Sequence, residues 1–213
     1  MKSILLSIKP KYVELIANGQ KTIEVRKTAP KCGVPFKGYI YCTKSIRARV
    51  FHLYINGGIG RQEFGITGHW RSGKKVVEVN PHLPACRYNS YLAEGKVIGE
   101  FICDKVESFS VGSLRSDDIE KLACLSYNEM ISYFYKPEEL DGKTAKQGFA
   151  WHISDLKIYD KPKELSEFRK PCPYGDLPCW LCPSCDRDEN DNLIQCFNTV
   201  SRPPQSYMYV EEL

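Results

Sequence analysis

The segment from Gly19 to Arg26 restricts the fold of this chain more than any other stretch, and its sequence is GQKTIEVR. Gly19 ends a short helical pattern, and a strand begins directly after it. Alternation along that strand assigns one face to Thr22, Glu24 and Arg26 and the other to Ile23 and Val25. The simplest interpretation is a half-buried strand whose charged side chains lie in solvent.

The residues on both sides of this segment predict a mixed α and β fold. The first strand is expected over residues 3–8, and Pro10 suits the first turn of the helix that follows. Further strands are expected over residues 21–26, 38–43, 95–103, 147–154, 156–159 and 206–211. Residues 113–135 are expected to be helical, because Ser126 and Glu129 have the spacing of a capping box.

Residues 51–93 are rich in glycine and proline, which predicts turns that join short strands. Within this region, residues 68–74 have the glycine and lysine spacing of a phosphate-binding loop. Lys75, however, stands where a serine or threonine would bind magnesium, and a strand pattern follows it. No helix N-terminus would then be present to bind phosphates. We therefore expect a hairpin turn and reject nucleoside triphosphate binding.

The length of 213 residues suggests one domain of ordinary size with a small appendage. We expect a domain over residues 1–168 and a Cys-rich segment over residues 169–213. No apolar run approaches the roughly 18 residues of a membrane span, and the apolar run at the N-terminus is too short for a secretory signal. These observations predict a cytoplasmic protein that does not contact a membrane.

Basic residues are concentrated in one part of the chain. Eight lysines and arginines lie between Lys21 and Arg49, against the single acid Glu24. Such a block favours a partner that carries phosphate. A solvated basic face without a partner is the alternative.

One acidic residue is expected in apolar surroundings. Glu100 shares a strand face with Ile98 and Ile102, so its carboxylate must be paired or protonated. Lys21 has the parity of Ile23 and is expected to lean inward. The hypothesis is a Lys21–Glu100 pair at the open end of a barrel, and two unrelated surface charges are the alternative.

Several of these stretches together resemble the ASCH family. They are the first strand, the Pro10 helix, the GQKTIEVR segment, residues 95–100 and residues 151–153. The resemblance covers roughly residues 1–168 and the last dozen. It implies a PUA-like β-barrel with flanking helices, and a cleft that binds RNA or a nucleoside-like ligand. Residues 157–165 and 202–207 look like those of proteins common in bacterial prophages.

One branch of that family hydrolyses acylated cytidine nucleosides with a lysine, a nucleophilic threonine and a glutamate. Lys21 and Glu100 stand where the lysine and the glutamate would fall. Glu24 occupies the position of the nucleophile, and Thr22 lies two residues away on the same face. A carboxylate therefore replaces the expected hydroxyl. Lys21, Glu24 and Glu100 remain the candidate acid–base set of a hydrolase or ribonuclease.

For nucleic-acid binding, the candidates combine cations for phosphate with polar and aromatic groups for bases. They are Lys9, Lys21, Thr22, Glu24, Arg26, Lys44, Trp151 and His152. Glu100 would add polar recognition. Aromatic residues in strands, such as Tyr39, Tyr41 and Trp151, belong more often to a core than to a stacking surface, and a histidine such as His152 is more often structural. A protein partner is a third possibility.

Half of the ten cysteines lie near the C-terminus, and thiols in the cytoplasm stay reduced. Their spacing predicts a structural zinc site of four thiolates, with Cys-Pro-x-Cys as a tight knuckle. The best four by spacing are Cys179, Cys182, Cys185 and Cys196, with Cys172 in reserve. An iron–sulfur cluster and free thiols are the alternatives. Without zinc, this segment is expected to be loose.

Overall fold

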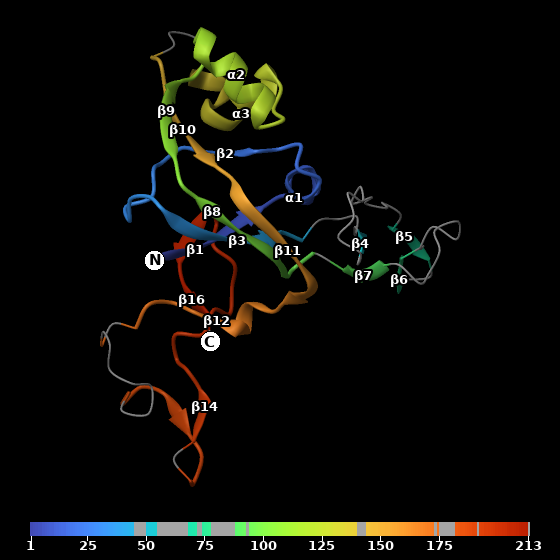
Figure 1. Ribbon diagram of the computed structural model, residues 1–213, viewed down its shortest axis with the longest axis vertical. Coiled ribbons are helices and arrows are strands. Elements are labelled where there is room, and N and C mark those ends of the chain that lie inside the picture. The colour runs from blue at the N-terminus through green and yellow to red at the C-terminus, as the bar shows by residue number, and fades with distance from the viewer. Residues whose placement is uncertain are drawn as a thin grey trace.

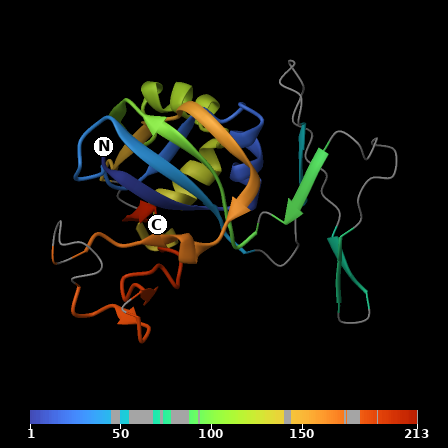
Figure 2. The same cartoon turned by 60° about the horizontal axis from the view of Figure 1, so that its bottom comes forward.

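A computed structural model of the chain gives the arrangement shown in Figure 1. It describes residues 1–44, 50–54, 68–71, 74–77, 88–92, 94–139, 144–172, 174, 182–190 and 192–212. Two main sheets form the body of the protein. Figure 2 shows the helices α2 and α3 on one side of these sheets and the C-terminal segment on the other.

The larger sheet has five strands in the order β11-β8-β3-β1-β15. These strands are β1 (Ser3–Ile8), β3 (Phe36–Cys42), β8 (Val97–Cys103), β11 (Ser154–Lys163) and β15 (Tyr207–Tyr209). β1 runs parallel to β3, and the other neighbours are antiparallel. The predicted first and last strands are therefore confirmed, and they lie side by side in this sheet.

The smaller sheet has three antiparallel strands in the order β2-β10-β9. They are β2 (Ile23–Arg26), β9 (Val106–Ser110) and β10 (Gln147–His152). The chain passes between the two sheets four times, and two of these passages are only one or two residues long, from β8 to β9 and from β10 to β11. The two crossings lie together, because the His152 N–H donates to the Lys105 carbonyl at 3.0 Å.

The prediction of a β-barrel is wrong in one respect, because neither of the two main sheets closes on itself. Near the edge of β2 a side chain takes the place of backbone pairing. Arg26 donates to the carbonyls of Ser7 and Ser206, at 3.0 and 3.1 Å. The fold is thus mixed α and β with two open sheets.

Three α-helices accompany the sheets in the described part of the chain: α1 (Pro10–Ala17), α2 (Leu114–Leu122) and α3 (Tyr127–Phe134). Gly19 follows α1 with a φ of +70°, a conformation that glycine adopts without strain. The N–H groups of Gln20 and Lys21 then both donate to the Leu15 carbonyl and turn the chain into β2. The capping box of Ser126 and Glu129 at the start of α3 is confirmed.

The remaining elements are short. They are β4 (Val50–Tyr54) with β7 (Tyr88–Leu92), β5 (Gly68–Arg71) with β6 (Lys74–Val77), β12 (Phe168–Arg169) with β16 (Glu211–Glu212), β13 (Asp186–Arg187) with β14 (Leu193–Gln195), and the 3₁₀ turns Pro137–Glu139 and Leu165–Glu167. Antiparallel pairing of β5 with β6 confirms the predicted hairpin in place of a phosphate-binding loop. In Figures 1 and 2, β4 to β7 lie to one side of the body.

Both faces of the five-stranded sheet are covered. Leu5 and Leu6, neighbours in β1, are each fully buried on opposite faces and belong to different core clusters. One face packs with α1 and Trp151. The other is covered by C-terminal residues, including Val200 and Val210. The described ends of the segment 169–213 therefore contact the body of the protein.

A third core cluster joins the smaller sheet to the helices. Ile23 and Val25 of β2 pack there with Met130 and Phe134 of α3. In the described part of the chain, none of the helices has the length and apolar character needed to cross a membrane.

Candidate functional site

A cavity of about 590 Å³ lies where α1, β2 and α3 meet. Figure 1 shows β2 running between α1 and the α2–α3 pair. Its lining comes from five separate stretches of chain: Ser7, Ile8, Lys9, Tyr12, Lys21, Glu24, Val25, Arg26, Thr43, Leu125, Glu129, Ser132, Tyr133, Gln205 and Ser206. The GQKTIEVR segment thus supplies four of the lining residues, three of them charged.

Glu24 lies between two cations at this cavity. Its Oε2 atom is 3.3 Å from Lys21 Nζ, and its Oε1 atom is 3.0 Å from Arg26 Nη2. The side chains of Lys21, Glu24 and Arg26 are 2%, 11% and 6% exposed. Charges so deeply buried must be paired and hydrogen-bonded, because each loses its hydration. We call these three residues the charged triad.

Backbone carbonyls accept further hydrogen bonds from the two cations. Lys21 Nζ donates to the Ala123 carbonyl at 2.9 Å, at the C-terminal end of α2, where the helix dipole favours a cation. Arg26 also donates to the Ser206 hydroxyl at 3.1 Å, in addition to the carbonyls of Ser7 and Ser206. The inward lean predicted for Lys21 is confirmed. The solvated face expected for Glu24 and Arg26 is wrong, since all four residues of β2 are buried.

The wall opposite β2 carries a second set of charges. Glu129 Oε1 accepts hydrogen bonds from Lys11 Nζ at 2.7 Å and from the Tyr12 hydroxyl at 3.3 Å. The bond from Lys11, and those from Ser126, lower the pKa of Glu129 to about 2. Burial, and then the charge of Glu129, raise the pKa of Tyr12 to about 12. Tyr12 therefore stays a neutral phenol at the pH of a cell.

The cavity continues into a second hollow of about 530 Å³. The two share Ser7, Thr43 and Gln205 in their linings. Lys9 lines the first hollow and Lys44 lines the second, and both side chains are exposed. The structure therefore places these two predicted cations along one continuous depression.

Glu100 lies elsewhere, and the expected Lys21–Glu100 pair is wrong. Glu100 accepts a hydrogen bond from the Tyr159 hydroxyl at 2.6 Å and lies 3.5 Å from Lys37 Nζ. Burial acts to raise the pKa of Glu100, but the bond from Tyr159 and the charge of Lys37 together hold it below its usual value. Glu100 is thus paired, as its strand position required, but it is not part of the cavity lining.

The other predicted binding residues also lie outside this lining. Trp151 is fully buried and packs edge-on against Phe36 and Tyr207, so its ring offers no stacking surface. Tyr39 and Tyr41 are likewise buried. Thr22 is exposed and does not line the cavity.

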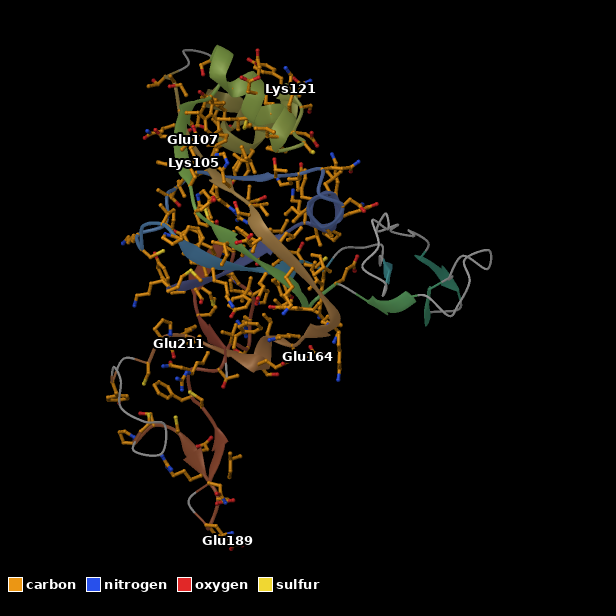
Figure 3. The ribbon with its side chains drawn as sticks, in the orientation of Figure 1. Lys105, Glu107, Lys121, Glu164, Glu189 and Glu211 are labelled. Atoms are coloured by element: carbon orange, nitrogen blue, oxygen red, sulfur yellow. The ribbon has the colours of Figure 1, made fainter. Side chains whose placement is uncertain are left out.

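His152 has a structural partner on the smaller sheet. Its Nε2 atom lies 2.7 Å from Glu107 Oε1, which also pairs with Lys105 at 2.6 Å. Figure 3 labels Glu107 of β9 and Lys105, which directly precedes that strand, close to each other. The structural interpretation of His152 therefore fits its surroundings, since it is not part of the cavity lining.

Several lining residues do not stand out in the sequence. Tyr12 belongs to the apolar stripe of a helix pattern and Glu129 to a capping box, while Tyr133 and Ser206 carry no motif. One signal is present: Glu129 and Tyr133 are four residues apart and share one face of α3. No local signal points to Ser206, which meets Arg26 across 180 positions of sequence.

The predicted zinc ligands are only partly described. Cys179 lies outside the described residues, whereas Cys182 and Cys196 are buried and Cys185 is half-buried. Across the described part of the chain, no three His, Cys, Asp or Glu side chains stand as a group that could hold a metal ion. The zinc site stays a prediction.

The fold and the site define a mixed α and β protein with a charged cavity beside two open sheets. Residues 6–110 match the family model of the ASCH domain, so this part of the chain is similar to that family, as its motifs predicted. No curated protein matches the chain.

Two solved structures illustrate the likeness. The crystal structure of ASCH from Zymomonas mobilis is 16% identical, with a TM-score of 0.49 over 99% of this chain and 88% of that one. A mutant form of the same Zymomonas mobilis protein is also 16% identical, with a TM-score of 0.45 over 78% and 77% of the two chains. Likeness at this level transfers no residue role to this chain.

Proposed function

We propose that the cavity binds one unstacked nucleotide of a single-stranded RNA. The observation that carries this proposal is the charged triad, which is buried yet borders a hollow large enough for such a ligand. Small-molecule sites usually enclose about 300–1,000 Å³, and this one measures about 590 Å³. Sequence-specific RNA recognition relies on bases that are splayed out of a single strand into such sites.

Glu24 is suited to the Watson–Crick edge of a base. A carboxylate has about four acceptor positions, and Lys21 and Arg26 use two of them. The remaining capacity fits a donor such as the exocyclic amino group of cytosine. Because both cations are themselves fixed by backbone carbonyls, the carboxylate is held in one position before a ligand arrives.

Tyr133 supplies an accessible ring for stacking. It lines the cavity and is 39% exposed, in contrast to the buried Trp151. Lys27 Nζ lies 5.1 Å from the centre of its ring. Stacking of a base on an aromatic ring contributes about 1–3 kcal/mol and depends little on base identity.

The RNA backbone would follow the continuous depression. Lys9 borders the first hollow and Lys44 borders the second. Lys9 would contact the phosphate on one side of the bound nucleotide, and Lys44 would contact the phosphate on the other side. This role agrees with the basic block from Lys21 to Arg49.

A pair of matched variants tests the proposal. Lys9→Ala removes a cation at the cavity. Lys121→Ala removes one from α2, where the Lys121 side chain is 79% exposed and is labelled in Figure 3. Affinity for a fluorescent single-stranded RNA of mixed sequence is measured by anisotropy at several salt concentrations. We expect Lys9→Ala to weaken binding several-fold and to reduce the salt slope by about one, whereas Lys121→Ala changes neither. Equal effects of both variants, or no binding by the unaltered protein, would refute the proposal.

A second candidate function rests on the contact between Lys21 and Glu24. An amine 3.3 Å from a carboxylate at a cavity is a possible acid–base pair for hydrolysis of an acylated nucleoside. Glu100 and Thr22 do not line this cavity, so two of the residues on which such a hydrolase would depend are missing from it. Incubation with an N-acylated cytidine tests this function. Turnover that Lys21→Met abolishes supports it, and an absence of turnover removes it.

A further inference from the structure

The β13–β14 hairpin brings two cysteines together at its base. Cys185 directly precedes β13, and Cys196 directly follows β14. Because Asp186 pairs with Gln195, the next position outward places Cys185 opposite Cys196. Residues opposite each other in an antiparallel pair have side chains about 4.5–5.5 Å apart, within reach of a shared ion.

A second stretch of pairing adds Cys172. Arg169 forms an antiparallel bridge with Thr199, and the Lys170 N–H donates to the Asn198 carbonyl at 2.9 Å. Cys172 follows two residues after Lys170. Cys196 begins the turn that carries Asn198, and the Thr199 N–H closes this turn by donating to the Cys196 carbonyl at 3.0 Å. Both cysteines are therefore close in sequence to this pairing.

A tight turn brings in the fourth cysteine. The Cys185 N–H points back to the Cys182 carbonyl, with an N···O distance of 3.4 Å, so the Cys-Pro-x-Cys segment folds as a one-turn knuckle. Such a knuckle directs two sulfur atoms to the same side. The thiols of Cys172 and Cys185 are both within hydrogen-bond reach of the Cys182 sulfur, and that of Cys196 is within reach of Cys185.

In this segment two cysteines are buried while two large apolar side chains are exposed. Cys182 and Cys196 are 3% and 4% exposed, whereas the large apolar residues nearby, Ile194 and Phe197, are 65% and 46% exposed. These two described apolar side chains therefore add little to a hydrophobic core at the hairpin. The inner positions are instead occupied by thiols, which is the arrangement of small domains that a metal ion holds together.

We propose that Cys172, Cys182, Cys185 and Cys196 bind one zinc ion as four thiolates in a tetrahedral arrangement. Cys172 thus takes the position that spacing alone assigned to Cys179. The backbone already gathers the four residues, and binding requires rotation of their side chains from hydrogen-bonded positions toward a common centre. Each thiol gives up its proton to solvent when it binds the ion.

Metal analysis of the purified full-length protein tests the proposal. We expect about one zinc ion per chain, and a loss of most of it in Cys172→Ser and in Cys196→Ser. Cys179→Ser should keep its zinc, as should Cys32→Ser, which alters a half-buried cysteine outside this segment. Retention of zinc by Cys172→Ser together with its loss from Cys179→Ser would overturn the assignment. So would stoichiometric iron, or an absence of bound metal.

A second measurement uses the unaltered protein and therefore does not depend on whether the ligand variants fold. The unaltered protein is stripped with a chelator, and the thiols that react with a chromogenic disulfide are counted before and after zinc is added back. We expect zinc to protect four thiols in the unaltered protein and in Cys179→Ser. Cobalt in place of zinc should give the intense thiolate absorption of a tetrahedral site. Protection of two thiols or fewer would contradict a four-thiolate site.

Discussion

Replacement of the carboxylate in the charged triad gives the sharpest prediction for stability. Glu24→Gln keeps the shape of the side chain but leaves Lys21 and Arg26, which are 2% and 6% exposed, without a negative partner. Removal of one member of a buried ion pair costs about 3–5 kcal/mol. The carbonyls of Ala123 and Ser7 still accept hydrogen bonds from the two cations. We therefore expect the lower end, about 3 kcal/mol less free energy of unfolding.

Urea unfolding followed by tryptophan fluorescence measures this loss. With a slope of about 2 kcal/mol per molar urea, the midpoint should fall by about 1.5 M while the slope stays unchanged. The control is Asp118→Asn, which breaks the ion pair with Lys121, where both side chains are about four-fifths exposed. Its effect should be below about 0.5 kcal/mol. If Glu24→Gln lowers the free energy of unfolding no more than this control does, the ion pairs of the charged triad do not stabilise the fold.

Three further variants probe separate parts of the fold. The pKa of Glu129 is about 2, below its ordinary value of 4.5, so its stabilising effect is complete above pH 4.5 and is lost as the pH falls toward 2. Glu129→Gln should accordingly lower the free energy of unfolding at pH 7 by about 1 kcal/mol, a value reduced because the Glu129 side chain is partly exposed. The loss should be much smaller at pH 2, and urea titrations at both pH values measure the difference. Gly38→Ala would place a Cβ atom 2.4 Å from the Phe101 ring, so a drop of about 1–3 kcal/mol is expected in thermal unfolding. Gly19→Ala meets no atom within 4 Å but keeps a φ of +70°, so it should cost only about 1 kcal/mol, and a loss equal to that of Gly38→Ala would argue against the packing account.

Short sequence patterns were sufficient to predict where the helices beside the cavity begin and end. Pro10 and Gly19 mark the two ends of α1, because proline suits the first turn and glycine accepts a positive φ. Ser126 and Glu129 mark the start of α3 in the same way. Each of these effects acts over a few residues, so sequence alone contains the information.

What covers a strand face could not be predicted in the same way. Alternation separates Glu24 from Ile23, but it does not say that the face of Glu24 meets α3 and residues 205–206 instead of solvent. The partners of Glu100 posed the same problem, since Tyr159 lies 59 positions away and the bond depends on the pairing of β8 with β11. Long-range contacts of this kind follow from the whole topology and not from any single pattern.

The Cys-rich segment is anchored in the body of the protein at both of its ends. Phe168 and Val210 both belong to the core cluster on one face of the five-stranded sheet, and β12 pairs with β16 at the point where the segment leaves and returns. Its two ends are therefore fixed by apolar packing whether or not an ion binds. Loop closure entropy grows only slowly with length, so a loop of about 40 residues costs the body little if it becomes disordered. Removal of zinc should thus melt the β13–β14 hairpin while the sheets remain folded, which predicts a separate low-stability transition in the stripped protein. Ser206 directly precedes β15, which pairs with β1, and it supplies no ligand to the proposed zinc site, so the cavity should retain its Arg26 contacts when the metal is removed.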